Sequence, residues 1–167
     1  MRLRPFISSL DFDEIKNWMP DERTHAMWCA NIIKYPIKKS NFENVMAEIA
    51  ERFKDTPFVA TDDEDNLIGF FCYSLNLENN EGMLKFVMIN PKLRGKGFGK
   101  QMIKLALEYA FKITGADSVQ LNVFAENTGA KKCYEGAGFS ERTHTPGAFT
   151  YKNEVWGRCN MVFQKPE

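Results

Sequence analysis

The sequence predicts a single α+β domain built around a mixed sheet. Three observations carry this prediction: a length of 167 residues, 44% hydrophobic and 26% charged residues, and interspersed helix and strand patterns without an internal repeat. A chain of this length can bury one core and is short for two. We therefore expect residues 1–167 to form one domain in which helices pack on a sheet.

The N-terminal part contains short elements and one clear amphipathic helix. Residues 2–6 are typical of a strand, and residues 11–14 have the Asp-x-x-Glu spacing of a helix start, which predicts a short helix through Trp18. Residues 40–43 form a cleaner capping box, and the helix after it is expected to end before Pro57. Its apolar positions recur with helical period at Phe42, Val45, Met46, Ile49 and Phe53.

The middle of the chain predicts a hairpin and a third strand. Residues 58–61 and 67–77 are apolar and β-prone, and the acidic run 62–66 between them suits a solvated turn. Residues 83–89 form the next strand pattern. It ends before Pro91, because proline has no N–H to donate to a sheet ladder.

Helix and strand patterns then alternate. A helical stripe begins at the end of a glycine-rich segment, and Gly115 is a plausible stop for that helix. Residues 119–124 are typical of a strand, and Asn127 can cap a helix that runs toward Gly138. The stripe is formed by Phe98, Met102, Leu105, Tyr109 and Ile113.

Two strands are expected at the end of the chain. One starts at Phe139 and the other spans residues 155–164. We expect a polar connection between them that includes Pro146 and Gly147.

Composition and charge argue against several classes of protein. Lys plus Arg and Asp plus Glu are both 22, so no global field favours nucleic acid or an anionic membrane. The first residues lack the apolar run of a signal peptide, and no apolar stretch approaches a membrane span, so we expect a cytoplasmic protein. The four cysteines contain no C-x-x-C pair and the two histidines lie far apart, so no metal site is expected.

A basic, glycine-rich segment is the strongest chemical signal. Residues 92–104 contain five basic residues and no acidic one, and Gly95, Gly97 and Gly99 alternate where a long helix begins. Glycine costs a helix about 0.5–1 kcal/mol relative to alanine, so this density needs a reason. Free N–H groups at a helix start, with no side chains in the way, let a phosphate approach closely. The basic residues are Lys92, Arg94, Lys96, Lys100 and Lys104.

Spacing separates this segment from two common phosphate loops. Gln101 follows Gly99-Lys100, so the Ser/Thr of the P-loop is missing, and Lys100 stands where G-x-G-x-x-G requires glycine. Two other interpretations stay open: a flexible turn before a solvated lysine face, and weak nucleic-acid binding by the basic patch, although no aromatic cluster accompanies it.

Two segments resemble a known family. Residues 89–99 read Ile-x-Pro-x-x-Arg-Gly-x-Gly-x-Gly and resemble the V-x-P-x-x-R-G-x-G-x-G segment of the GNAT superfamily of N-acetyltransferases, whose core signature is Q/R-x-x-G-x-G/A. Residues 127–139 match the second family pattern, N-x-x-A-x-x-x-Y-x-x-x-G-F. The resemblance covers residues 57–142 well. It implies a GNAT-like fold, with a mixed, mostly antiparallel sheet flanked by helices.

The resemblance also implies an activity and a cosubstrate. Acetyl-CoA, without a metal, would donate an acetyl group to a primary amine of a small molecule or a protein N-terminus by direct attack. A splayed strand would offer backbone groups to the pantetheine arm, the loop amides would hold the pyrophosphate, and Asn127 would cap a helix or touch the cofactor. The implied cofactor-binding residues are Val87, Met88, Ile89, Arg94, Gly95, Lys96, Gly97, Phe98, Gly99, Lys100 and Asn127.

Tyr134 matches the tyrosine that serves as general acid in the family. Its phenol, neutral at pH 7 because it titrates near ~10, would hydrogen-bond the CoA sulfur as charge builds there. A core aromatic is the alternative interpretation. The general base is not assigned: many family members have a glutamate where this chain has Lys85 and Phe86, the acidic candidates fit surface positions better, and the amine can arrive neutral. Those candidates are Glu78, Glu81 and Glu126.

The acceptor amine is not identified by the sequence. In the family the early helices and the segment before the last strand shape the acceptor site, which corresponds here to residues 21–35 and 144–155. A non-catalytic acyl-CoA-binding or regulatory module is the alternative function, and a homodimer that pairs through edge strands is a further expectation. The aromatic residues that would line an acceptor site are Trp28, Tyr35, Phe149, Tyr151 and Trp156.

Overall fold

The computed structural model describes residues 1–166, and its seven strands form one sheet in the order β1-β2-β3-β4-β5-β7-β6. The pair β4 and β5 is parallel and the other neighbouring pairs are antiparallel, which confirms the predicted mixed, mostly antiparallel sheet. The strands are β1 (Arg2–Pro5), β2 (Thr56–Thr61), β3 (Leu67–Asn76), β4 (Glu81–Ile89), β5 (Ser118–Phe124), β6 (Ser140–Tyr151) and β7 (Glu154–Gln164). The α-helices are α1 (Ser8–Ile15), α2 (Glu22–Cys29), α3 (Lys39–Phe53), α4 (Phe98–Tyr109) and α5 (Thr128–Gly136), and a π-helical turn (Ala110–Thr114) continues α4 up to Gly115.

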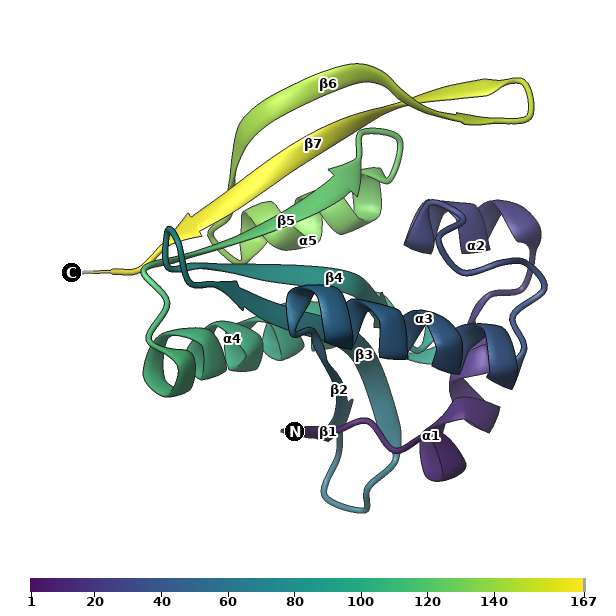
Figure 1. Ribbon diagram of the computed structural model, residues 1–167, viewed down its shortest axis with the longest axis horizontal. Coiled ribbons are helices and arrows are strands. Elements are labelled where there is room, and N and C mark those ends of the chain that lie inside the picture. Colours follow the sequence, from purple (N-terminus) through teal and green to yellow (C-terminus); the bar gives the residue numbers. More distant parts are fainter. Residues whose placement is uncertain (167) are drawn as a thin grey trace.

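Helices cover both faces of the sheet. On one face, α4 and α5 bury an apolar cluster that includes Leu84, Leu121 and Met102. On the other face, α1 and α3 cover β2, β3 and β4, with Phe42 and Phe70 at the centre of a second cluster. Figure 1 shows α3 lying across the sheet, with α4 and α5 on the other side. The core is therefore divided into two layers by the sheet.

The sheet divides between β4 and β5. These parallel strands pair only from Glu81 with Ser118 to Leu84 with Leu121. Beyond Leu84, β4 continues to Ile89 without β5 beside it, and the two strands diverge toward the side where α2 lies (Figure 1). The divergence leaves a gap, lined on one edge by unpaired backbone of β4.

Most predicted elements are confirmed, but two helix starts were placed too late. Helix α1 begins at Ser8, because the Asp11 carboxylate lies inside the first turn and accepts from Ile7 N at 2.7 Å. Helix α3 begins at Lys39, because Asn41 Oδ1 accepts from Lys38 N at 2.8 Å. In both helices the polar side chain reaches back to the backbone from inside the helix instead of capping it from the preceding position.

The prediction for the last two strands was wrong in one respect. Pro146 and Gly147 lie within β6, at a register shift between Thr145 and Phe149, and not in the connection to β7. A bulge on an edge strand tolerates proline because no further strand needs a backbone N–H donor at that position. The hairpin turn lies at residues 152–153 instead. In residues 1–166, no helix has the length and apolar character needed to cross a membrane.

Candidate functional site

The edge of β4 that faces the gap presents the backbone of Val87 and Ile89. Asn90 N donates to Ile68 O of β3 at 2.8 Å, and the antiparallel register continues through Met88. Because backbone groups alternate between the two edges of a strand, the N–H and C=O of Met88 face β3. Of the three strand residues predicted to meet the cofactor, Val87 and Ile89 thus face the gap.

The glycine loop connects this strand end to α4. Gly95 and Gly97 have φ angles of 75° and 82°, in the left-handed region that favours glycine, and a Cβ on either would meet nothing within 4 Å. Their role is therefore conformational. Within residues 1–166, none of the backbone amides from residue 95 to residue 100 donates a hydrogen bond to the protein, and Gly97 supplies no side chain to cap α4. Several free N–H groups at a helix start form an anion-binding site.

The side chains around these amides are cationic. Lys96 and Lys100 are exposed, and neither forms an ion pair in the part of the chain that the structure describes. The same is true of Lys92, Arg94 and Lys104. Their charge is thus available to an anionic ligand, in a protein whose acidic and basic residues balance overall.

Gly99 brings α4 close to its neighbours. A Cβ at this position would lie 3.0 Å from Cys133 Sγ on α5 and 3.6 Å from Ile89 Cγ1 on β4. The glycine loop, the end of β4 and α5 therefore meet at one point. Both sequence blocks that resembled the GNAT family thus lie together in space.

Tyr134 belongs to the apolar cluster against which residues of the end of β4 pack. It is 7% exposed, and Val87, Ile89 and Phe98 pack against the cluster that contains it. Burial raises the pKa of the Tyr134 hydroxyl well above its usual value. The residue is therefore a core aromatic, as the alternative interpretation held, and its role as general acid stays a prediction.

Asn127 caps α5. Its Oδ1 accepts from Ala130 N at 3.3 Å, which confirms the predicted capping role. Its second role, contact with a cofactor, stays a prediction.

The acidic residues considered as general bases are engaged elsewhere or exposed. Glu81 is 7% exposed and accepts from Ser118, Gln120 and Arg142. Glu126 Oε1 accepts from Gly157 N at 3.3 Å. Glu78 is exposed.

Lys85, one of the two residues where many family members have a glutamate, takes part in an ion pair. Its Nζ lies 2.6 Å from Oδ2 of Asp55, whose side chain is fully buried. No free carboxylate therefore replaces the missing glutamate at this point of β4.

The two predicted acceptor segments do meet. Arg23 of α2 forms a bidentate pair with Glu154 at the start of β7, with distances of 2.8 and 2.7 Å. Lys152 Nζ lies 2.8 Å from a Glu22 oxygen, which adds a second link between α2 and the β6–β7 hairpin. Phe149, Tyr151 and Trp156 form one aromatic cluster, to which α2 contributes Ala26 and Met27 and β5 contributes Phe124.

The aromatic residues of α2 and the following loop lie apart from that cluster. Tyr35 packs on His25, with ring centroids 5.3 Å apart, and Trp28 packs on Phe86 of β4, with centroids 5.7 Å apart. The sequence prediction assigned no helix to α2. The available signal was Asp21, whose carboxylate caps the helix by accepting from Thr24 N at 2.7 Å.

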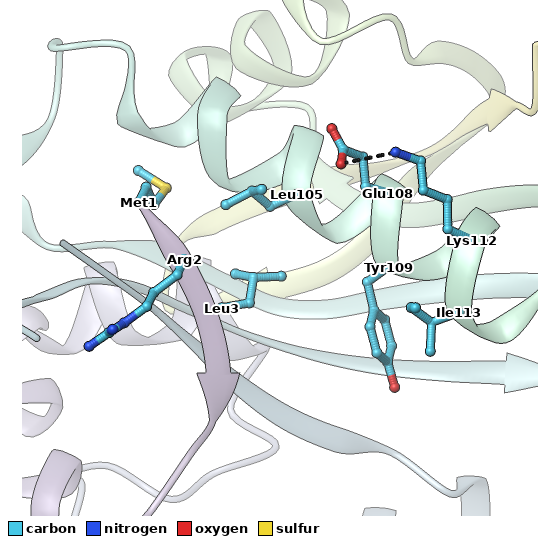
Figure 2. A pocket seen from close by; sticks show the side chains of 8 residues that line it. All are labelled: Met1, Arg2, Leu3, Leu105, Glu108, Tyr109, Lys112 and Ile113. Atoms are coloured by element: carbon cyan, nitrogen blue, oxygen red, sulfur yellow. Dashed lines mark hydrogen bonds and ion pairs between the residues drawn. The ribbon is translucent and has the colours of Figure 1, made fainter. Parts of the chain in front are cut away.

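Two surface hollows lie outside the predicted site. One, of about 380 Å³, lies between β1 and α4; Figure 2 shows Leu3 and Tyr109 among its apolar walls and a Glu108–Lys112 ion pair beside them. The other, of about 220 Å³, is lined by Glu14 and Trp18 and borders the glycine loop at Lys92. Neither hollow contains a predicted site residue. Among residues 1–166 no cluster of His, Cys, Asp or Glu has the makeup of a metal site.

Comparison with known proteins agrees with this geometry. The sequence model described as the acetyltransferase (GNAT) family matches residues 12–139. A spermidine N(1)-acetyltransferase of Vibrio cholerae is 35% identical over 88 residues, which are 52% of this chain and 50% of that protein. A mycothiol acetyltransferase of Renibacterium salmoninarum is 25% identical over 136 residues, 75% of this chain and 40% of that protein. The matched segments thus span half or less of these curated relatives.

Solved structures share the whole fold. The crystal structure of a spermidine N-acetyltransferase from Vibrio cholerae in complex with CoA and spermine superposes with a TM-score of 0.81, at 25% identity, and the match covers 98% of this chain and 94% of that one. The family match includes both the glycine loop and the α5 block, and these two segments meet beside the same gap. The chain belongs to the acetyltransferase (GNAT) family.

Proposed function

We propose that this chain is an acetyl-CoA-dependent N-acetyltransferase. It would move an acetyl group by direct attack to a primary amine of a small molecule or a protein N-terminus. The observation that carries the proposal is the run of free amides from residue 95 to residue 100, beside unpaired backbone of β4. This arrangement suits a long ligand with a diphosphate at one end and a hydrogen-bonding arm at the other, which is the chemistry of CoA.

The proposed position of CoA runs from the glycine loop to the gap beside β4. The amides of residues 95–100 would hold the pyrophosphate, with Arg94, Lys96 and Lys100 supplying charge. Val87 and Ile89 would bond the pantetheine arm. Met88 fits this role less well, because its backbone faces β3.

The chemistry requires a new C–N bond and the loss of the C–S bond. The neutral amine attacks the thioester carbonyl, a backbone N–H on the gap edge of β4 stabilises the oxyanion, and the departing sulfur takes a proton. We assign that proton to Tyr134, since burial raises its pKa and keeps the phenol protonated at neutral pH. The amine loses its own proton to solvent, from which Tyr134 recovers the proton that it gave to sulfur, and we assign no carboxylate among residues 1–166 as the general base.

The acceptor is proposed only as a chemical class, a primary amine. Two relatives are named for spermidine or spermine, and another, of Pseudomonas phage PaMx11, for 5-NmdU. In this chain, Glu22 and Glu154 already pair with Lys152 and Arg23. A polycation would have to displace these pairs, so monoamines are at least equal candidates.

The test is release of free CoA thiol from acetyl-CoA. The purified protein is incubated with spermidine, with aliphatic and aromatic monoamines, and with peptides that have a free N-terminus, and a reaction without amine serves as control. We expect amine-dependent thiol release. Tight CoA binding without turnover across this panel would contradict the proposal and favour an acyl-CoA-binding module.

We also propose that residues 1–167 act as one acetyltransferase domain, in the cytoplasm, and that the protein pairs as a homodimer. The support for pairing is β6, an edge strand of the sheet with exposed side chains along most of its length. Light scattering coupled to size-exclusion chromatography would report twice the chain mass. A monomer mass at every concentration would contradict the homodimer.

A further inference from the structure

Strand β4 contains a bulge at the gap. Lys85 pairs with Cys72 and Met88 with Phe70, so one more residue lies between these partners on β4 than on β3. Phe86 takes up the extra length with a φ of 52°. This left-handed conformation is costly for a bulky residue and persists only where its surroundings hold it.

Trp28 of α2 holds this bulge from outside the sheet. Its indole Nε1 donates to the carbonyl oxygen of Phe86 at 2.8 Å. The two rings also pack together, with centroids 5.7 Å apart and planes inclined by 59°. The bond is close to the usual length for an N–H donor to a carbonyl.

The bond determines where the next amide points. The Phe86–Val87 peptide is planar and trans, so its N–H points opposite to its C=O. Because the carbonyl points to Trp28 on α2, the Val87 N–H points away from α2. The register also places this N–H on the edge of β4 that β5 has left.

We propose that Trp28 is a positioning residue that fixes the Val87 N–H as the donor to the thioester carbonyl oxygen. This inference rests on the proposed acetyltransferase function. Trp28 acts through the peptide it holds. Without the indole donor, the Phe86–Val87 peptide is free to rotate and the oxyanion donor loses its fixed direction.

Helix α2 is itself anchored on both sides of the gap. Trp28 contacts β4, while Ala26 and Met27 pack in the aromatic cluster of the β6–β7 hairpin. Arg23 adds its bidentate pair to Glu154. The indole therefore projects from a fixed element, which a positioning role requires.

Packing alone would not need the indole nitrogen. Phenylalanine at position 28 keeps an aromatic ring against Phe86, and 3-benzothienylalanine keeps the two-ring shape with sulfur in place of N–H. Each change removes the donor and preserves most of the contact area. A matched control is Tyr73→Phe on β3, which removes the bond between the Tyr73 hydroxyl and Thr114, 2.7 Å long. The ring of Tyr73 lies against Gly82 near the start of β4, and its hydroxyl makes no bond to the bulge.

The experiment compares steady-state kinetics and the infrared band of bound acetyl-CoA labelled with ¹³C at the carbonyl. In the wild-type protein, a donor on the carbonyl oxygen shifts this band to lower frequency than in free acetyl-CoA. We expect Trp28→Phe and the benzothienyl variant to lower kcat about tenfold, since a complete loss of an oxyanion donor costs 10²–10³. The KM for acetyl-CoA should stay within about twofold, and the band should move back toward the free value.

The outcomes separate this inference from the proposed function. If both Trp28 variants kept the wild-type kcat and the wild-type band frequency, the role of Trp28 would be overturned and the acetyltransferase function would stand. A wild-type protein that binds acetyl-CoA but acetylates no amine contradicts the function, and the infrared band then decides the role of Trp28 by itself. Failure of the wild-type protein to bind acetyl-CoA overturns both. If Tyr73→Phe gave the same kinetic and spectral changes, a general loss of stability would explain them and the inference would fail.

Discussion

Burial fixes the ring of Tyr134 and keeps its hydroxyl protonated at neutral pH. Packing against Phe139, at a centroid distance of 6.1 Å, restricts the direction of the ring. Burial also raises the pKa of the hydroxyl, so the phenol is a weaker acid than a free tyrosine. Tyr134 would therefore act by donating a hydrogen bond to the sulfur as negative charge builds there, and any proton that it transfers is regained from solvent.

Tyr134→Phe should leave acetyl-CoA binding nearly unchanged and lower turnover. The ring and its packing remain, and only the donor to the leaving sulfur is removed. General-acid catalysis typically contributes a factor of about 10²–10⁴ in rate. Calorimetry with CoA and steady-state kinetics with a reactive amine measure the two effects. An unchanged kcat would remove Tyr134 from the mechanism.

Gly97→Ala should weaken acetyl-CoA binding without lowering kcat. The φ of 82° disfavours any side chain, so the loop would shift its amides away from the pyrophosphate, and we expect KM for acetyl-CoA to rise about tenfold. Gly136→Ala is the matched control. It lies in α5 with open space around it, and alanine there should stabilise the protein by about 0.5–1 kcal/mol. Equal KM values for the two variants would argue against the loop as the phosphate site.

Lys85→Met should destabilise the protein by about 3–5 kcal/mol, because it leaves the buried Asp55 carboxylate without its partner. The double variant with Asp55→Asn should recover most of this loss, since the uncompensated charge is gone. Urea unfolding measures both. The double variant, once folded, should keep its turnover number, and a large loss of kcat would instead give Lys85 a part in the chemistry.

The local structure of the candidate site was predictable where the residue type itself is informative. Gly95 and Gly97 were singled out by the density of glycine at a helix start, and the structure gives both a φ that favours glycine. Asn127 was predicted as a cap because caps use a short polar side chain. The link from Trp28 to Phe86 was not, because it joins residues 58 positions apart and depends on a bulge that leaves no pattern in the sequence. The same applies to the pairing of Lys85 with Asp55.

A side-chain cap of the usual kind placed the start of α5 well, but α2 was missed although Asp21 caps it, and α1 and α3, which lack such a cap, were displaced. Helix α5 begins where Asn127 indicated. Helices α1 and α3 begin earlier than expected because Asp11 and Asn41 bond back from inside the first turn. Helix α2 is short, and its stability comes from contacts with the β6–β7 hairpin more than from its own sequence.

The contact between α2 and the hairpin should depend on pH in the acidic range. Arg23 lowers the pKa of Glu154 to about 2, and Lys152 lowers that of Glu22. A carboxylate whose pKa is lowered by folding contributes stability to the folded state. This contribution is fully present above pH 4.5, the pKa in the unfolded chain, and is lost as the pH falls toward about 2. Trp156 lies under Arg23, at 5.3 Å, so its fluorescence should change across this window.

Two variants test the assignment of this change. Arg23→Gln should move the midpoint of the fluorescence transition to higher pH, because the Glu154 carboxylate loses the cation that lowers its pKa. Arg52→Gln removes an exposed pair with Glu48 on α3 and should leave the signal unchanged. A transition with the same midpoint in Arg23→Gln and wild type would show that another group controls it.

At the scale of the whole molecule, charge is balanced but unevenly placed. Lys plus Arg equals Asp plus Glu, yet the loop and the start of α4 carry cations without ion-pair partners among residues 1–166. Attraction for an anionic ligand is therefore local and exposed to solvent ions, whose screening length is about 8–10 Å near physiological salt.

Acetyl-CoA binding should weaken as salt rises. We expect KM for acetyl-CoA to increase severalfold between low and high salt, because exposed cations are screened. Acetylpantetheine, which lacks the pyrophosphate, should show little change and serves as the control. Equal salt dependence for the two donors would mean that the cations do not act on the phosphates.

The overall architecture was predictable because its strands and helices each carry their own periodicity, from the hairpin of β2 and β3 to the stripe of α4. The divergence of β4 from β5 has no such signature. It depends on where two strands, distant in sequence, stop pairing after Leu84.

That divergence makes the sheet incomplete until something occupies it. The backbone of Val87 and Ile89 has no neighbouring strand, so a pantetheine arm would act as a substitute strand and join the two halves of the molecule. A ligand that binds only the folded state adds stability in proportion to RT ln(1 + [L]/Kd), about 2.7 kcal/mol at a hundredfold excess over Kd. The supply of acetyl-CoA would then govern how long each copy survives proteolysis as well as how fast it works.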